Sequence, residues 1–162
     1  MSVDRVKAYL ANYHMDSRVM ELQLSSATVE LAARALGTQE ARIAKTLSFH
    51  GQGGYILLVA AGDARIDNGK FKATFGLKAR MLAPQEVIDN IGHAVGGVCP
   101  FAIENPAVKV YLDESMKRFE TVFPACGSGN SAIEMTLAEL ELTSRSQGWV
   151  DVCKGWQEQE EE

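Results

Sequence analysis

The sequence predicts an α/β (α+β) domain in which helices surround a single mixed β-sheet. Two segments rich in strand-forming residues, 41–49 and 55–61, flank the glycine-containing turn signal at 50–54, which predicts two neighbouring strands. Short helical segments with capping residues alternate with further apolar segments along the rest of the chain. Strand segments outnumber long helical segments, and this interleaving is typical of one sheet covered by helices.

The first third of the chain predicts two helices and a short strand. Apolar residues recur on one side of the segment 3–13, as in an amphipathic helix. Residues 18–24 are predicted to form a short strand. A helix over 29–36 should end at Gly37, because glycine readily adopts the left-handed conformation that closes a helix. The candidates for its N-cap oxygen are Ser25, Ser26 and Thr28.

The remaining two thirds alternate between short helices and strands. A helix over 67–75 should end at Gly76, and Pro84 fits the first position of the next helix. Thr136 and Glu139 have the spacing of a capping box and predict the start of the last helix. Asp113 can cap the turn that follows it. Strands are predicted near 94–98, 108–113 and 121–125, with a closing strand at 149–152.

Composition indicates one domain over 1–156 followed by an acidic tail over 157–162. The chain of 162 residues carries a net charge of −5, and four of its acids lie in the tail. This charge argues against a general nucleic-acid or DNA binder. The segment 68–84 contains four bases and no acid, which could be a solvated face or a local contact with one end of an RNA.

The sequence predicts a cytoplasmic protein without a membrane span, metal or cofactor. The chain has no apolar run near the roughly 20 residues that a membrane helix requires. Its first residues lack the apolar segment of a signal peptide. The three cysteines and three histidines are isolated from one another, so neither a disulfide framework nor a zinc cluster is expected.

Lys45 is the most informative single residue. In a strand over 41–49 it shares a face with Ile43, Leu47 and Phe49, because alternate side chains point to opposite sides. A lysine among large apolar residues loses hydration unless its ammonium is received by an anion or a water-filled cleft. A pocket for an anionic ligand would explain this position. So would an internal salt bridge or a strand end from which the side chain reaches water.

Two glycine-rich segments are further candidates for a site. In 96–101, two glycines allow close approach of a ligand, and Pro100 stiffens the segment so that backbone N–H groups could be presented to a carbonyl. An ordinary turn is the alternative. The segment 127–132 formally fits a dinucleotide-binding fingerprint. It lies near the carboxyl end without a helix directly after it, so a polar turn lining a cleft or a plain hairpin is the better interpretation.

The residues do not assemble into a nucleophile–histidine pair. Cys99 could act as a nucleophile, but the sequence places no histidine beside it, and a reactive thiol requires a lowered pKa. A hydrolase that depends on Cys99 is therefore the weakest of the hypotheses.

Three elements in order carry a resemblance to a known family: 43–47 with Lys45, 96–101 with its two glycines and Pro100, and 127–129 followed by Ile133-Glu134-Met135. Together they resemble the YbaK family, the free-standing relatives of the prolyl-tRNA synthetase editing domain. The likeness runs from about Ser25 to Val152. It implies a mixed sheet surrounded by helices, with the site in a cleft.

The resemblance implies an aminoacyl-tRNA deacylase that removes a small non-cognate amino acid, typically from tRNA(Pro), without a metal or a covalent intermediate. Lys45 would be the essential lysine that anchors the terminal adenosine, and the loop Gly96–Pro100 would hold the aminoacyl carbonyl. Aminoacyl-tRNA and prolyl-tRNA synthetase are the implied partners. The substrate-binding candidates beside Lys45 are Thr46, Gly96, Gly97, Val98, Cys99, Pro100, Gly127, Ser128 and Asn130.

Three positions depart from the family pattern. Cys99 stands where relatives often have serine, and Ala125 and Ala132 stand where some cysteine-specific members have serine or aspartate. These departures weaken a specificity for cysteine. They also leave open a non-catalytic protein that binds tRNA or a synthetase and has lost hydrolysis.

Overall fold

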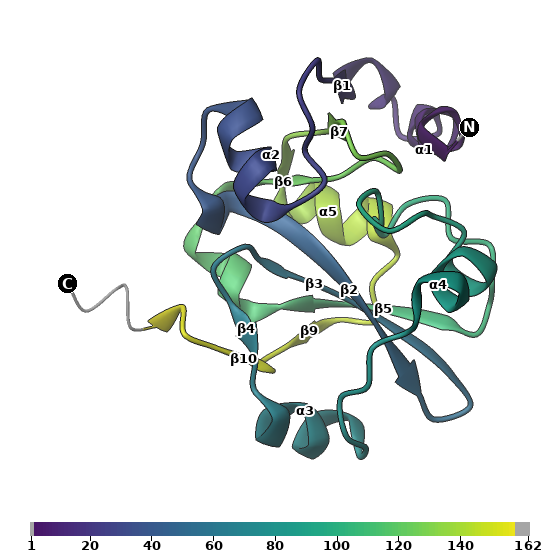
Figure 1. Ribbon diagram of the computed structural model, residues 1–162, viewed down its shortest axis with the longest axis vertical. Coiled ribbons are helices and arrows are strands. Elements are labelled where there is room, and N and C mark those ends of the chain that lie inside the picture. The colour runs from purple at the N-terminus through teal and green to yellow at the C-terminus, as the bar shows by residue number, and fades with distance from the viewer. Residues whose placement is uncertain (1, 158–162) are drawn as a thin grey trace.

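A long antiparallel pair of strands forms the centre of the molecule in the computed structural model, which describes residues 2–157 (Figure 1). Strand β2 covers Ile43–Gly51 and strand β3 covers Gly54–Ala61. The two strands pair in register from Ala44 opposite Ala61 to Gly51 opposite Gly54. The predicted pair of strands and its glycine turn are thus confirmed, and β3 is buried over its last six residues.

The central pair belongs to a six-stranded mixed sheet with the order β8-β6-β2-β3-β5-β9. Parallel pairs join β2 to β6 and β3 to β5, whereas β6 and β8 are antiparallel. Two small antiparallel ribbons, β1–β7 and β4–β10, complete the strands. Their bounds are Met20–Glu21 for β1, Arg65–Ile66 for β4, Val108–Asp113 for β5, Thr121–Pro124 for β6, Ser131–Ala132 for β7, Met135–Thr136 for β8, Trp149–Val150 for β9 and Cys153–Lys154 for β10.

Helices surround the sheet, which confirms the predicted α+β class. In Figure 1, α1 and the β1–β7 ribbon lie at one end of the molecule and α3 lies at the opposite end. None of the helices formed by residues 2–157 has the length and apolar composition needed to cross a membrane. The helices are α1 over Ser2–Ala11, α2 over Val29–Leu36, α3 over Asn68–Phe75, α4 over Pro84–Ile91 and α5 over Leu137–Ser144.

Local signals set most helix ends. Thr28, not Ser25 or Ser26, caps α2 by accepting a hydrogen bond from the backbone N–H of Leu31, and Gly37 ends the helix in the left-handed conformation. The predicted capping box of α5 is present. Ser26 is therefore not needed as a cap, and this leaves its hydroxyl available for another role.

Two strand predictions need correction. Residues 94–98 form a loop and not a strand, because Gly96 adopts a φ of +96° and the side chain of Val95 is 66% exposed. The predicted strand over 18–24 is reduced to Met20–Glu21, and Asp16–Arg18 before it form a 3-10 turn. The acids predicted to form the tail, at positions 158 and 160–162, lie outside the described residues.

Candidate functional site

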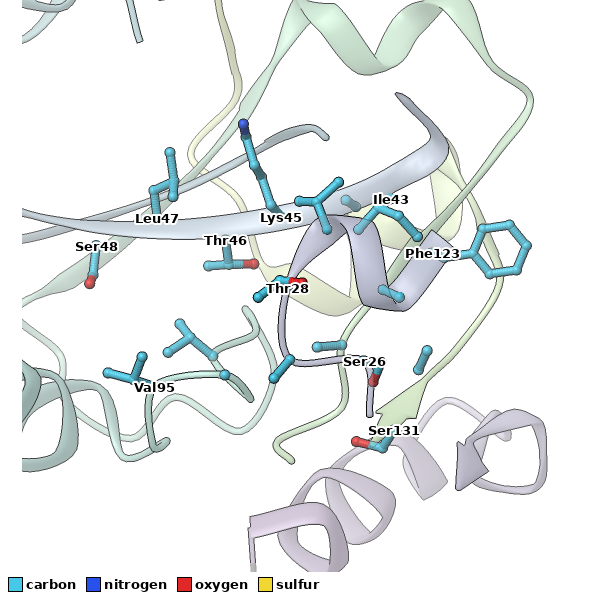
Figure 2. Close-up of a pocket in the computed structure, with 18 of the residues that line it drawn as sticks. Ser26, Thr28, Ile43, Lys45, Thr46, Leu47, Ser48, Val95, Phe123 and Ser131 are labelled. Carbon is cyan, nitrogen blue, oxygen red and sulfur yellow. The ribbon is translucent and has the colours of Figure 1, made fainter. Parts of the chain in front are cut away.

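A cavity of about 440 Å³ lies alongside β2. Its wall combines segments that are distant in sequence. These are residues 26–29 with Ala32 and Leu36 of α2, residues 43–48 of β2, residues 81–82 with the start of α4, three residues of the loop 95–98, Phe123 and Ala125 at the end of β6, and strand β7. The loop 95–98 is the one whose glycines were singled out by the sequence. Figure 2 shows the cavity between β2 and these segments.

One part of the cavity wall is apolar. Ala32 and Ala33 of α2 pack with Ile43 of β2, and Val29, Leu36 and Phe123 lie against this cluster. All of these residues except Ala33 line the cavity. Because alanines occupy the α2 contact, the helix approaches the sheet closely and still leaves room for a small apolar group. Two further alanines line the cavity, Ala125 directly after β6 and Ala132 in β7.

Hydroxyl groups form a second part of the wall. Figure 2 shows Thr46 and Ser48 extending from β2 into the hollow that Ser26 and Ser131 border from the other side. The oxygens of Ser26 and Thr46 are buried, and neither has a hydrogen-bond partner within residues 2–157. Buried hydroxyls are normally paired, and leaving one unpaired costs roughly 1–3 kcal/mol. These two oxygens are therefore candidate ligand contacts.

Lys45 lines the cavity, but its ammonium group lies on the other side of β2 from Thr46 and Ser48 (Figure 2). Its Nζ donates hydrogen bonds to the carbonyl oxygens of Gly62, at 3.3 Å, and of Ala64 in the turn after β3. An ammonium has three donors. The described residues thus give it two carbonyl partners instead of the internal carboxylate that was one of the alternatives.

Desolvation dominates the electrostatics of Lys45. Burial lowers the pKa of its ammonium from the ordinary value, and the nearby Cys153, Asp63 and Asp113 oppose this shift. Among the described residues that line the cavity, Lys45 is the only one with an ionisable side chain. The cavity therefore combines a largely apolar and hydroxyl-bearing wall with a single lysine, whose ammonium group lies across β2 from the hydroxyls of Thr46 and Ser48.

Only some residues of the loop that was predicted to hold a carbonyl face the cavity. Gly96 and Val98 line the cavity, whereas Gly97, Cys99 and Pro100 are buried behind the wall. A Cβ atom at position 97 would come within 2.6 Å of the backbone of Gly127. Close packing of two backbones therefore explains Gly97 and brings the two glycine-rich segments into contact.

Only part of the second glycine-rich segment reaches the cavity. Ser131 lines it, whereas Gly127, Ser128 and Asn130 do not. Ser128 Oγ donates to Ser131 Oγ at 2.7 Å, and Asn130 Nδ2 donates to the carbonyl of Leu22 at 3.0 Å. Ser128 and Asn130 thus support the wall from behind.

Cys99 is buried beside His93, a pairing that the sequence did not predict. Its Sγ lies 3.5 Å from His93 Nε2, and its side chain is inaccessible to solvent. Burial raises the pKa of the Cys99 thiol to about 12. A nucleophilic thiolate requires the opposite shift and an exposed sulfur, so the geometry gives no support to a hydrolase that depends on Cys99.

Sequence reasoning missed several residues of the cavity. Ser26 contributes a hydroxyl, and Phe123 and Val95 contribute apolar surface. The sequence contained no separate signal for Ser26, because this residue was also a candidate for the N-cap of α2. Among residues 2–157, His, Cys, Asp and Glu side chains do not gather in groups of three that could hold a metal ion.

Known proteins share sequence with most of this chain, including the residues of the cavity. Residues 25–142 match the model of the aminoacyl-tRNA editing domain family. A Bacillus subtilis (strain 168) protein described as uncharacterized, YwhH, is 54% identical over 158 residues, which cover 97% of this chain and all of that protein. The proline–tRNA ligase of Thermosipho melanesiensis is 33% identical over 126 residues, which cover 77% of this chain and 22% of the ligase.

Solved structures also share the fold over nearly the whole chain. A proposed trans-editing enzyme for prolyl tRNA synthetase superposes with a TM-score of 0.85 at 32% identity, covering 95% of this chain and 98% of that one. The hypothetical protein APE2540 superposes with a TM-score of 0.76 at 27% identity, covering 89% and 99% of the two chains.

The buried His93 predicts a loss of stability in weak acid. Burial lowers the pKa of this imidazole below its usual value of 6.5, although the Phe101 carbonyl opposes the shift. The unfolded chain therefore takes up a proton before the folded chain does. The unfolding free energy should fall as the pH drops below 6.5, by up to about 1.4 kcal/mol per pH unit, until the folded-state pKa is reached.

Urea unfolding of the wild type and of His93→Gln between pH 8 and pH 4.5 measures this effect. The difference between the two proteins isolates the contribution of His93 from that of other titrating groups. It should shrink as the pH falls through this window. A difference that stays constant across the series would contradict the prediction.

Proposed function

The chain belongs to the aminoacyl-tRNA editing domain family, and from this premise we propose that it hydrolyses the ester bond of mis-charged aminoacyl-tRNA. We further propose tRNA(Pro) carrying a small non-cognate amino acid as the substrate and prolyl-tRNA synthetase as a partner. The similarity to part of a proline–tRNA ligase and to a proposed trans-editing enzyme supports this choice. The protein would work in the cytoplasm, where charged tRNA is made.

The composition of the cavity wall is the observation that carries the proposal. The described residues that line it include hydroxyls and one lysine but no carboxylate, histidine or thiol. A wall of this kind offers no strong general base for water and no activated nucleophile. An aminoacyl ester is already activated, so positioning and polarisation of its carbonyl can supply much of the rate enhancement. Water is then the attacking group, helped by the terminal hydroxyl of the tRNA.

Each part of the wall then has a role. Gly96, whose backbone borders the cavity, would hold the aminoacyl carbonyl, and the unpaired hydroxyls of Ser26 and Thr46 would bind polar atoms of the substrate. The apolar wall formed by α2 and Phe123 would receive the side chain of the amino acid. Lys45, whose ammonium group lies across β2 from these hydroxyls, would bind the terminal adenosine with the donor that Gly62 and Ala64 leave free.

Exposed basic side chains in the segment before Met81 would suit the rest of an RNA end. Lys72, Lys78 and Arg80 are exposed in the segment that leads to Met81. Met81 lines the cavity with a side chain that is 57% exposed. Phosphates beyond the terminal nucleotide could be neutralised by these bases although the protein as a whole is acidic.

A panel of charged tRNAs tests the proposed activity. Purified protein is mixed with tRNA(Pro) carrying alanine, cysteine, serine, threonine or 2-aminobutyrate, and the surviving ester is followed over time. At least one small amino acid should be released well above the buffer rate, and prolyl-tRNA(Pro) should survive. Saturable tRNA binding with every ester intact would instead indicate the non-catalytic alternative that the alanines at 125 and 132 left open.

Lys45→Gln separates the charge of Lys45 from its structural contacts. Glutamine keeps an N–H donor on a side chain one bond shorter than that of lysine, but it lacks the cation. We expect deacylation to fall by about 100-fold, while circular dichroism and the melting temperature stay close to those of the wild type. Lys109→Gln, at an exposed strand position of β5, is the matched control. Full activity of Lys45→Gln would remove the proposed role.

Thr46→Val tests the unpaired hydroxyl. Valine has nearly the shape of threonine, and the threonine oxygen has no partner within the described residues. We therefore expect the unfolding free energy to stay the same or rise, by up to about 1 kcal/mol, while deacylation falls. If activity were kept in full, Thr46 would not contact the substrate. A clear loss of stability would mean that its oxygen is paired within the folded protein.

A further inference from the structure

The loop 92–102, whose middle residues border the cavity, is closed at its base by a side chain from α1. Arg5 donates from Nη1 to the carbonyl of Gly92 at 3.2 Å and from Nη2 to the carbonyl of Ala102 at 3.1 Å. One planar guanidinium thus bridges the first and last residues of the loop. The fixed fork of its donors holds the two carbonyls at a defined separation.

A second bridge lies inside the first. His93 Nε2 lies 2.8 Å from the carbonyl oxygen of Phe101, so this nitrogen must carry the proton and donate it. His93 Nδ1, 2.8 Å from Ser2 Oγ, then accepts from that hydroxyl. His93 is 1% exposed, so its two hydrogen bonds compensate for the burial of both ring nitrogens.

The backbone of this loop requires such support. Gly92, Gly96 and Ala102 all have positive φ, and the value for Ala102, +58°, is unfavourable for a residue with a Cβ atom. Between the bridges, Val95 projects into solvent with 66% of its side chain exposed. A loop with a strained end and an exposed tip holds one conformation only if its base is fixed from outside.

Helix α1 also holds the segment against which the loop packs. A Cβ atom on Gly127 would come within 2.9 Å of the carbonyl oxygen of Ser2 and within 3.0 Å of Val6. Gly97 packs in turn on the backbone of Gly127. The helix therefore contacts both the base of the loop and the surface behind its middle.

We propose that Arg5 and His93 are positioning residues that set the loop 92–102 for catalysis, and that α1 is therefore part of the editing site. This inference rests on the proposed function, because the loop acts through its contact with the ester. The family match begins at residue 25, so α1 lies outside it. Neither Arg5 nor His93 lines the cavity, so both act through the backbone of Gly96.

The proposal predicts a specific kinetic defect. Loosening the base of the loop misplaces the groups that hold the carbonyl, and a misplacement of about 1 Å can reduce a rate by about 100-fold. The cavity wall that binds the terminal adenosine and the amino-acid side chain comes mainly from other segments. We therefore expect kcat to fall by about 10- to 100-fold in Arg5→Ala and in His93→Gln, with KM within about threefold of the wild type.

Lys7→Ala is the matched control, because Lys7 lies on the same helix and pairs with Glu21 instead of with the loop. Its kcat should equal that of the wild type. Because Arg5 and His93 close the same loop, the double variant Arg5→Ala/His93→Gln should lose far less than the product of the two single effects. Losses that multiply, or an equal loss in Lys7→Ala, would overturn the proposal.

Hydrogen exchange tests the same inference without activity. The amide of Gly97 donates to the Ala94 carbonyl at 3.0 Å, and it should exchange at least about tenfold faster in Arg5→Ala and His93→Gln than in the wild type or Lys7→Ala. Unchanged exchange in both loop variants would overturn the positioning role. If the wild type fails to deacylate any substrate but the variants differ in exchange as expected, the proposed function is refuted, while the support of the loop by Arg5 and His93 still stands.

Discussion

The antiparallel pairing of β2 with β3 fixes which side chains can take part in the site. Because side chains alternate along a strand, the register that places Thr46 toward the cavity places Lys45 on the other side of β2. The same pairing brings the turn after β3 to the Lys45 ammonium, where two carbonyls replace part of its lost hydration. A slip of one residue would exchange the two roles and bury a hydroxyl in place of the cation.

The site has few charges and many close backbone contacts. Among the described residues that line it, Lys45 carries the one positive charge, and the rest of the wall consists of apolar side chains, hydroxyls and the loop at Gly96. Chemistry in such a cavity depends on geometry more than on proton transfer. Elements behind the wall therefore matter because they set its geometry. Helix α1 contacts the loop 92–102 through Ser2 and Arg5, and it packs against Gly127.

Most of the secondary structure could be predicted because its signals are local. Thr28, Gly37 and the capping box at Thr136 define helix ends through contacts within a few residues. The prediction failed at 94–98, where short apolar residues resemble a strand. The glycine at 96 takes a φ that a strand does not allow, and the loop is held from α1 by Arg5, which bonds to Gly92, and by Ser2, which bonds to His93. A local sequence pattern cannot predict contacts with residues that are distant in the sequence.

The sequence by itself determined the α+β class and the central pair of strands, and it singled out Lys45 and the two glycine-rich segments as candidates for the site, because side-chain periodicity and glycine content can be seen in neighbouring residues. Only the tertiary structure decided that Lys45 meets carbonyls and not a carboxylate, that Cys99 is buried against His93, and that Ser26 joins Thr46 at the cavity. These outcomes depend on which segments pack together, and packing brings into contact residues that the chain separates by as many as 134 positions.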